Sequence, residues 1–196
     1  MAKRVILAGV LGGIAMYVWT SVAHVVLPLG AIGVSEISKN EDSFLASLHA
    51  TLGESHGMYI FPSGSDTTDA AALQQYAQKV ANGPSGLLIY HPSGAQSLSA
   101  SQLGIEFLIE LIQALLVVAL LSQSRMETFG SRAAFVTIAG VLAALATHVS
   151  YWNWYGFPAS YTVAYIFIQI VGFAIVGIVA AIVMRSPARV TAAVPA

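Results

Sequence analysis

The 196-residue sequence contains no cysteine. This absence excludes disulfides, thiolate metal sites, a cysteine nucleophile and S-palmitoylation. Charge is also scarce, because only 9% of the residues are Asp, Glu, Lys or Arg, against about 25% in a typical soluble domain. A formal net charge of −1 provides no basic field that could capture nucleic acid. These shortages exclude most ordinary soluble folds and argue against a nucleic-acid partner.

Familiar catalytic motifs are absent as well. The sequence has no GxSxG, HExxH, P-loop or Rossmann glycine fingerprint. Each of these motifs places a nucleophile, a metal or a phosphate at a fixed spacing. The few Ser–His pairs have no aspartate placed by sequence to complete a triad. The sequence therefore leans away from an enzyme.

Long apolar runs are abundant in this chain. Hydrophobic residues make up 57% of it, and its mean hydropathy is +0.75. A helix needs about 20 apolar residues to cross the hydrocarbon of a bilayer. Four runs approach that length, at Val5–Leu27, Leu103–Leu121, Ala133–Val149 and Tyr161–Met184. The predicted fold is a mainly helical membrane protein, a four-transmembrane-helix bundle with a small α+β extracytoplasmic domain inserted between helices 1 and 2.

The distribution of basic residues predicts domain boundaries and orientation. Residues 1–27 form transmembrane helix 1, residues 28–102 the extracytoplasmic domain, and residues 103–196 helices 2–4 with a short cytoplasmic tail. Lys and Arg resist translocation. Six of the eight basic residues flank one side of the predicted spans: Lys3, Arg4, Arg125, Arg132, Arg185 and Arg189. We expect a bacterial inner-membrane protein, multi-pass, with both termini cytoplasmic and residues 28–102 outside.

The first run has an alternative interpretation as a secretory signal peptide. A basic start, an apolar run and small residues at Ser21–Ala23 fit a cleaved signal. The apolar run is longer than the core of a signal peptide, which has about 7–15 apolar residues. The bulky residues Tyr17 and Trp19 lie near the supposed cleavage site. A retained helix is the favoured interpretation.

The extracytoplasmic domain contains signals for two helices and two strands. One helix is expected after a cap at Asn40, with Gly53 ending it, and a second from Asp66 to Val80. Two β-prone runs at 57–64 and 86–94 both end in Pro-Ser-Gly. If these strands are neighbours, the helix between them predicts a parallel pair with a right-handed crossover. Turn chemistry explains the Pro-Ser-Gly repeat, and an exposed docking edge is the functional alternative.

Polar residues are placed at one level of the bundle by all four predicted spans. Ionisable groups at membrane depth are rare and face a bundle interior or a polar cavity. Glu106 and Glu110 are four residues apart on one helix, so they share a face. The other candidates are His24 and His148, with Gln113 and Gln169 extending a polar stripe.

Four interpretations of these residues remain open. In the first, the glutamates are hydrated or protonated interface residues. In the second, Glu106, Glu110, His24 and His148 bind iron, manganese or zinc. In the third, a histidine ligates a non-covalent haem or pigment, and in the fourth, the group forms a proton or small-solute path. No bound cofactor is the default expectation. The Glu-x-x-His spacing of di-iron bundles is absent, which weakens the metal interpretation.

An aromatic segment joins the third and fourth predicted spans. Its members are Tyr151, Trp152, Asn153, Trp154, Tyr155 and Phe157, with Tyr161 and Tyr165 following. Such rings favour the membrane interface. A stacking platform for a pigment, a quinone or a neighbouring subunit is the functional alternative.

Small residues four positions apart recur in the spans. They are Gly9, Gly13, Gly140, Ala144, Gly177 and Ala181. Small residues at this spacing let helix backbones approach closely. The pattern alone does not distinguish packing within this chain from packing against a partner.

The leading functional hypothesis is a non-catalytic accessory or assembly subunit of a larger membrane complex. Its partners would be the lipid bilayer and other membrane protein subunits, contacted through the extracytoplasmic domain and the aromatic edge. The alternative is a metal-, haem- or pigment-binding redox protein that uses Glu106, Glu110, His24 and His148. A proton or small-solute transporter is less favoured, because the spans show no inverted repeat or broken helix.

Overall fold

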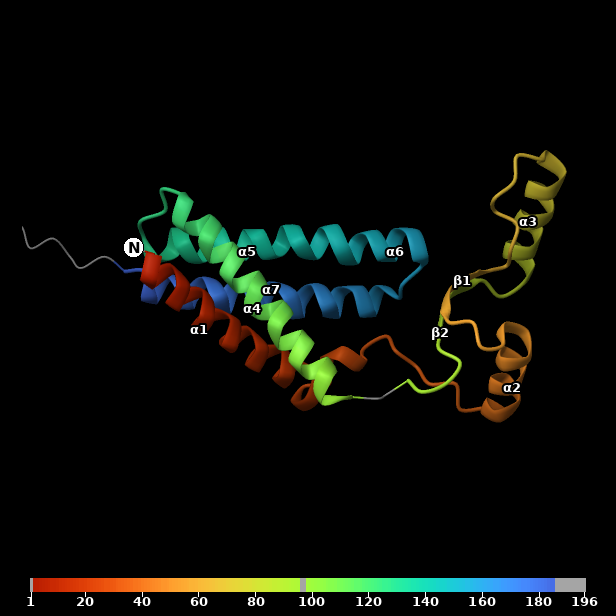
Figure 1. Cartoon of the computed structure of the whole chain (residues 1–196). Coiled ribbons are helices and arrows are strands. Elements are labelled where there is room, and N and C mark those ends of the chain that lie inside the picture. Colours follow the sequence, from red (N-terminus) through yellow and green to blue (C-terminus); the bar gives the residue numbers. More distant parts are fainter. Residues whose placement is uncertain (1, 96–97, 186–196) are drawn as a thin grey trace, which may run out of the picture.

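The structure is a computed structural model that describes residues 2–95 and 98–185. It is mainly helical, with one small sheet (Figure 1). Four helical segments are long and apolar enough to cross a membrane: Ala2–Val26, Ala100–Gln123, Phe129–Tyr155 and Ala159–Val183. The four predicted spans are therefore confirmed as helices. Arg189, one of the six basic residues used to predict orientation, lies outside the described residues.

The first and third long helices each end in a π-helical turn. Helix α1 (Ala2–Ser21) continues into η1 (Val22–Val26), and a short 3₁₀ turn η2 (Leu29–Ala31) follows. Helix α5 (Phe129–Ala144) continues into η3 (Leu145–Val149) and then into α6 (Ser150–Tyr155).

The aromatic segment is therefore largely helical rather than a loop. Tyr151–Tyr155 lie in α6, and only residues 156–158 turn the chain into α7 (Ala159–Val183). Gly156 ends α6 with a left-handed φ of 69°, a conformation that glycine adopts without steric cost. Apolar periodicity stopped at Val149 in the sequence because aromatic and polar side chains replace the aliphatic ones there, although the backbone stays helical.

The second and third long helices begin at side-chain caps. Ser99 and Gln102 form a reciprocal capping box at the start of α4 (Ala100–Gln123). Thr128 and Ser131 form the same arrangement at the start of α5. Because each box satisfies two backbone N–H groups, it places these helix starts earlier than the apolar runs alone indicate.

Close helix packing within this chain accounts for the small residues singled out in the spans. A Cβ added at Gly9 or Gly13 would lie within 3.0 Å of Leu115 or Leu111 in α4. A Cβ at Gly140 would lie 2.4 Å from Cβ of Phe173, and one at Gly177 2.8 Å from the carbonyl oxygen of Ala133. Ala144 and Ala181 are fully buried. Helix α1 thus packs on α4 and α7, and α5 packs on α7.

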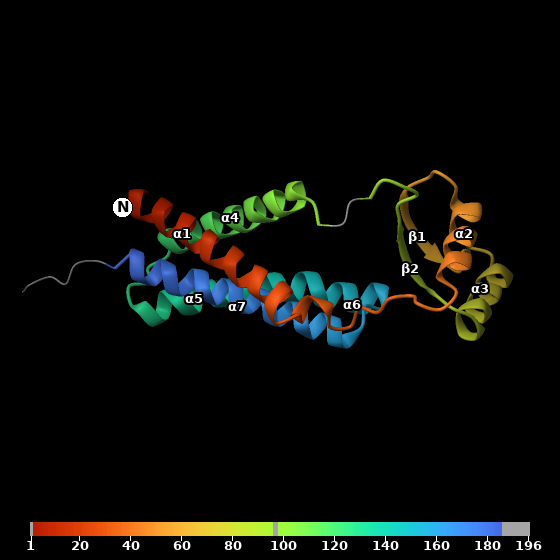
Figure 2. The same cartoon turned by 90° about the horizontal axis from the view of Figure 1, so that it is seen from below.

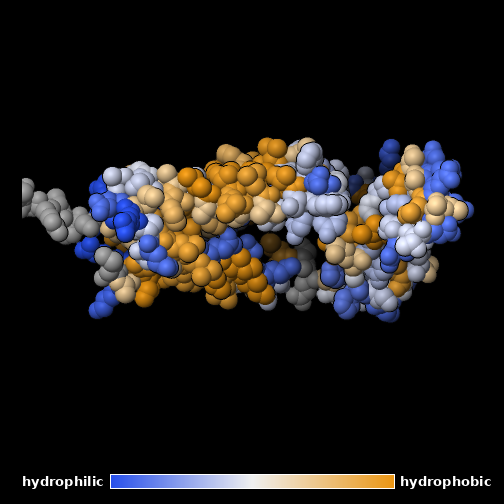
Figure 3. All heavy atoms as spheres, turned by 90° about the horizontal axis from the view of Figure 1, so that it is seen from above, coloured by the Kyte–Doolittle hydropathy of each residue, from blue (hydrophilic) through white to orange (hydrophobic). Residues whose placement is uncertain are grey.

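The bundle closes at one end and opens at the other. Its buried core includes Val118, Leu121, Val136 and Val176, close to the turn between α4 and α5. From that turn α4 diverges from α5 and α7, which both views show (Figures 1 and 2). A hydrophobic band covers the bundle between more hydrophilic ends (Figure 3). We call the closed end the basic end, because it carries Arg4, Arg132 and Arg185, and the other the domain end.

Residues 41–90 form a small α+β unit beyond the domain end. It contains α2 (Glu41–Leu52), β1 (Gly57–Phe61), α3 (Ala70–Asn82) and β2 (Gly86–Tyr90). Gly53 ends α2, as expected, with a left-handed φ of 57°. Asn40 precedes α2 in a left-handed conformation, and its side chain makes no capping hydrogen bond. Asp69 caps α3 instead of Asp66, by accepting a hydrogen bond from Ala71 N, so the helix begins at Ala70.

The prediction of a parallel strand pair is wrong. Strands β1 and β2 pair antiparallel, with Gly57 opposite Tyr90 and Phe61 opposite Gly86. A parallel pair needs a connection that crosses a face of the sheet. Here α3 lies beyond one end of the strands (Figure 1), so the chain returns to the end that it left. The connection is a hairpin with a helix inserted in it.

Candidate functional site

Both candidate histidines of the bundle lie in π-helical turns. His24 is in η1 and His148 is in η3. π-Helical turns are rare and occur frequently at functional sites, because the extra residue redirects the side chains around it. Both imidazoles pack against Tyr165 of α7, with ring centroids 5.8 Å apart for His24 and 5.7 Å apart for His148.

Hydrogen bonds orient the two imidazoles. His24 Nδ1 donates to the carbonyl oxygen of Thr20 at 2.9 Å, which leaves Nε2 of a neutral ring as an acceptor. His148 Nε2 lies 3.0 Å from Oε1 of Gln169. A Cβ at Gly30 would lie 2.2 Å from Cδ2 of His24, so the glycine lets η2 pack directly on this ring.

Glu110 is the deepest charged residue of the bundle among the described residues. Only 3% of its surface is exposed, and none of the residues that the structure describes forms a hydrogen bond with its Oε2 atom. The hydroxyl of Thr20 lies beside the carboxylate. Glu106, one helical turn away, is exposed. A buried polar atom without a partner costs about 1–3 kcal/mol, so a hydrogen-bond donor that reaches Oε2 would stabilise Glu110.

One cavity brings together all six polar residues predicted from the sequence. Its volume is about 560 Å³, and His24, Glu106, Glu110, Gln113, His148 and Gln169 line it. Residues of α1, η1, α4, η3 and α7 line it, at the level where α4 diverges from the bundle. We call it the polar cavity. Its volume is within the range of small-molecule sites.

The polar cavity does not contain a convergent metal site. In the ranges 2–95 and 98–185, no group of three or more His, Asp or Glu side chains is close enough to hold one ion. The two glutamates and two histidines share a cavity without surrounding a single point. A divalent metal therefore has no ready ligand set in this arrangement.

Several residues that line the polar cavity were not among the predicted site residues, and Thr20, Thr147 and Tyr165 are three of them. Tyr165 packs on both histidines. Its spacing offered a signal, since Tyr161, Tyr165 and Gln169 recur every four residues on one face of a helix. The sequence alone groups both tyrosines with the aromatic segment.

A row of aromatic rings runs from the polar cavity toward strands β1 and β2. Tyr165 stacks on Tyr161 with centroids 4.2 Å apart, and Phe157 follows at 5.4 Å from Tyr161. Tyr151 stacks on Phe157 at 5.5 Å and contacts Tyr155 at 5.8 Å. This packing includes three of the predicted stacking residues. Trp152, Asn153 and Trp154 are not part of this packing, and 79% of Trp154 is accessible.

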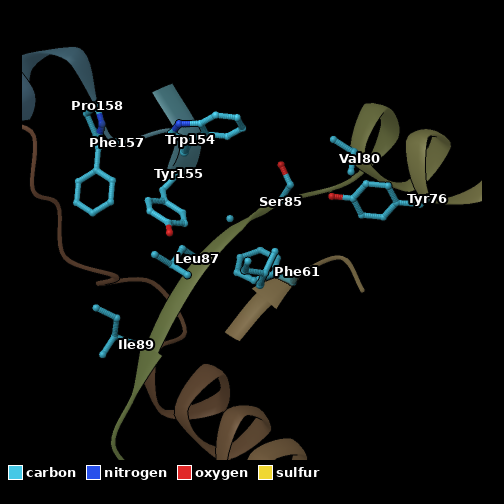
Figure 4. A pocket seen from close by; sticks show the side chains of 13 residues that line it. Phe61, Tyr76, Val80, Ser85, Leu87, Ile89, Trp154, Tyr155, Phe157 and Pro158 are labelled. Carbon is cyan, nitrogen blue, oxygen red and sulfur yellow. The ribbon is translucent and has the colours of Figure 1, made fainter. Parts of the chain in front are cut away.

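The row ends at a second space, which lies between the sheet and the end of the bundle (Figure 4). This space of about 650 Å³ is lined by Phe61, Leu87 and Ile89 from the strands, by Tyr76 and Val80 from α3, and by residues 154–158. We call it the sheet cleft. Most of its lining side chains are apolar or aromatic.

We compared the chain with known proteins. No protein-family model, curated protein or solved structure matches it.

Proposed function

We propose that the chain is a multi-pass membrane protein that binds a small amphiphilic molecule in the polar cavity. The observation that carries this proposal is Glu110, whose buried Oε2 lacks a partner in a cavity of about 560 Å³. A bound molecule that donates a hydrogen bond would remove that cost. Since α4 and α5 diverge at this level, the molecule would enter sideways from the bilayer.

Membrane insertion with the basic end in the cytoplasm is part of the proposal. Arg4 donates to the carbonyl oxygen of Arg185, and Arg132 donates to that of Met184, so these three arginines gather at one end. The positive-inside rule places such an end in the cytoplasm. Residues 28–102 would then be outside, in a bacterium whose inner membrane holds the chain. Central packing of α1 between α4 and α7 supports its retention as a helix.

The cysteine-free sequence makes orientation directly measurable. Single cysteines introduced by Ser55→Cys and Met126→Cys occupy exposed positions in residues 28–102 and in the turn at the basic end. We expect a membrane-impermeant maleimide to label intact cells only at position 55. Labelling at position 126 alone would reverse the proposed orientation.

Ligand occupancy is tested on protein purified from its native membranes. Small molecules are extracted and identified by mass spectrometry from the wild type, from Thr147→Trp and from Leu142→Trp. Thr147 lines the polar cavity, whereas Leu142 is 70% exposed on α5 and does not. We expect a molecule that is retained by the wild type and Leu142→Trp and lost from Thr147→Trp. Equal recovery from all three proteins would contradict the proposal.

The same preparation separates this proposal from a redox cofactor. An absorption spectrum and elemental analysis report haem, pigment or iron directly. A Soret band or stoichiometric iron that disappears in His148→Ala would identify the occupant as a cofactor of the kind considered from the sequence.

The sheet cleft favours a second function, as an accessory subunit that docks on another membrane protein. Met58, Ile60 and Ile89 are each at least 60% exposed on the two strands. A two-stranded sheet is marginally stable by itself, and both outer strand edges are unpaired within the described residues. We propose an extended apolar segment of a partner subunit as the occupant, added to a strand edge.

Native electrophoresis of solubilised membranes tests docking. We expect the wild type to migrate as a complex larger than its own mass, and Ile89→Asp to migrate as the free chain. Lys79→Asp, at the exposed end of α3, is the control and should leave the complex intact. Migration of the wild type as a monomer would contradict docking, and co-expression of two differently tagged copies distinguishes a partner protein from self-association.

A further inference from the structure

The polar cavity is electrically one-sided. Glu106 and Glu110 line it, and no Lys or Arg does among the described residues. The arginines resolved in the bundle lie at the basic end, where Arg4 and Arg132 bond to carbonyl oxygens of that end. In a low-dielectric interior, opposite charge is strongly favoured over like charge. While His24 and His148 are neutral, the cavity therefore favours positive charge over an anion.

The two glutamates occupy different depths. Glu106 is exposed at the mouth, and Glu110 is buried at the floor with a free Oε2 acceptor. A carboxylate oxygen accepts hydrogen bonds and donates none when ionised. The partner of an ionised Glu110 therefore carries a hydrogen on a donor atom. A quaternary ammonium has positive charge without such a hydrogen.

The remaining wall is apolar and aromatic. Met16, Leu103 and Ile168 line the cavity together with the rings of Tyr17 and Tyr165. Aliphatic walls favour an apolar ligand body, and the faces of aromatic rings attract a cation. A bare inorganic cation would leave this surface unused and, as described above, would lack a convergent set of ligands.

We propose that the polar cavity binds a protonated lipophilic amine, whose ammonium group donates a hydrogen bond to Glu110 and whose apolar body lies against Leu103 and Ile168. This inference rests on the proposed binding function and names its ligand class. Glu106 attracts the amine at the mouth, and Glu110 holds it at the floor. Because both the charge and the donor hydrogen are used, the amine is selected over a neutral alcohol and over a quaternary ammonium.

A matched series of adamantane compounds tests the proposal, because the apolar body is constant and only the head group changes. Full-length protein in nanodiscs of zwitterionic lipid is titrated by calorimetry with 1-adamantylamine, 1-adamantanol, adamantyltrimethylammonium and adamantane-1-carboxylate. Empty nanodiscs correct for partitioning into lipid. We expect the amine to bind most tightly, the alcohol and the quaternary ammonium more weakly, and the carboxylate least.

Two glutamate variants and one control identify the acceptor. Removing one partner of a buried charge pair is costly, so Glu110→Gln should weaken amine binding at least about tenfold. Exposed charge pairs contribute little, so Glu106→Gln should weaken it up to about fivefold. Glu127→Gln makes the same change in the exposed turn at the basic end and should not alter binding. Alcohol binding should be nearly the same in all three variants.

The outcomes separate the ligand class from the binding function. Equal binding of amine and alcohol, with no effect of Glu110→Gln, would overturn the amine inference. If Thr147→Trp still abolished binding of both compounds, the proposed binding function would stand. If no member of the series bound the wild type, the amine inference would fall, and the extraction experiment would decide the binding function by itself.

Discussion

The same four helices build two different environments at the two ends of the bundle. At the basic end, small residues such as Gly140 and Gly177 bring backbones into contact, and Leu121 and Val136 fill the core. At the domain end, α4 separates from α5 and α7, and polar side chains line the space. The contrast shows that close packing in one half of a bundle can stabilise the fold while the other half keeps a buried carboxylate oxygen, Oε2 of Glu110, without a hydrogen bond from the described residues.

The two ends also differ in backbone regularity. Both π-helical turns are at the domain end, and each contains one of the histidines that pack on Tyr165. The helices are regular α-helix at the basic end. Irregular backbone costs stability and persists where the surroundings hold it, so its position beside the polar cavity agrees with a site selected for binding rather than for packing.

The largest expected effect comes from emptying part of the closed core. Leu121 is 2% exposed at the basic end, whereas Leu116 on the same helix is 62% exposed. Buried Leu→Ala changes cost about 2–5 kcal/mol, because they remove contacts and leave a cavity. Thermal unfolding in detergent, followed by helical circular dichroism, should show a large loss of stability for Leu121→Ala and little for Leu116→Ala. Equal losses would mean that the basic end does not carry the stability.

A second, smaller effect comes from overfilling the α5–α7 contact. The Cβ of Gly140→Ala would lie 2.4 Å from Cβ of Phe173, and overpacking costs about 1–3 kcal/mol. Gly104 in α4 has nothing within 4 Å of an added Cβ. The same unfolding measurement should therefore show destabilisation by Gly140→Ala and none by Gly104→Ala. A neutral Gly140→Ala would indicate that these helices are free to separate.

The architecture of the bundle was predictable because its signals are local. Apolar runs and small residues such as Gly140 follow from side-chain chemistry at fixed helical spacing. Strand direction was not predictable in this way. The pairing of β1 with β2 depends on where α3 lies in space, and a short helix between two strands fits either a crossover or the extended hairpin that is observed.

The candidate site was predictable at the level of composition and depth. Six residues chosen as polar groups at one level of the spans line one cavity. The sequence did not reveal the π-helical turns or the position of Tyr165 between the histidines. Both features depend on tertiary packing, such as the contact of Gly30 with His24. The residue pattern of a single helix does not predict such contacts.

At the domain end, replacing a buried residue should raise the stability of the protein instead of lowering it. Glu110→Met removes the buried oxygen that lacks a partner and replaces it by a flexible apolar group. Since an unsatisfied buried polar group costs about 1–3 kcal/mol, we expect this variant to unfold at a higher temperature than the ligand-free wild type. Glu106→Met, at the exposed mouth, should change stability less. Destabilisation by Glu110→Met would show that this carboxylate supports the fold, and the contrast between the two ends would fail.

The smallest expected effect concerns the wall that joins α1 to α7 beside the polar cavity. Trp19 Nε1 donates to the carbonyl oxygen of Ile168 at 2.8 Å, and a single hydrogen bond contributes about 0.5–1.5 kcal/mol. Trp19→Phe should therefore lower stability slightly and loosen this wall, without disturbing the core at the basic end. Hydrogen–deuterium exchange should rise around residues 19–24 and stay constant around Leu121. A uniform rise in exchange along the whole bundle would mean that both ends unfold as one unit.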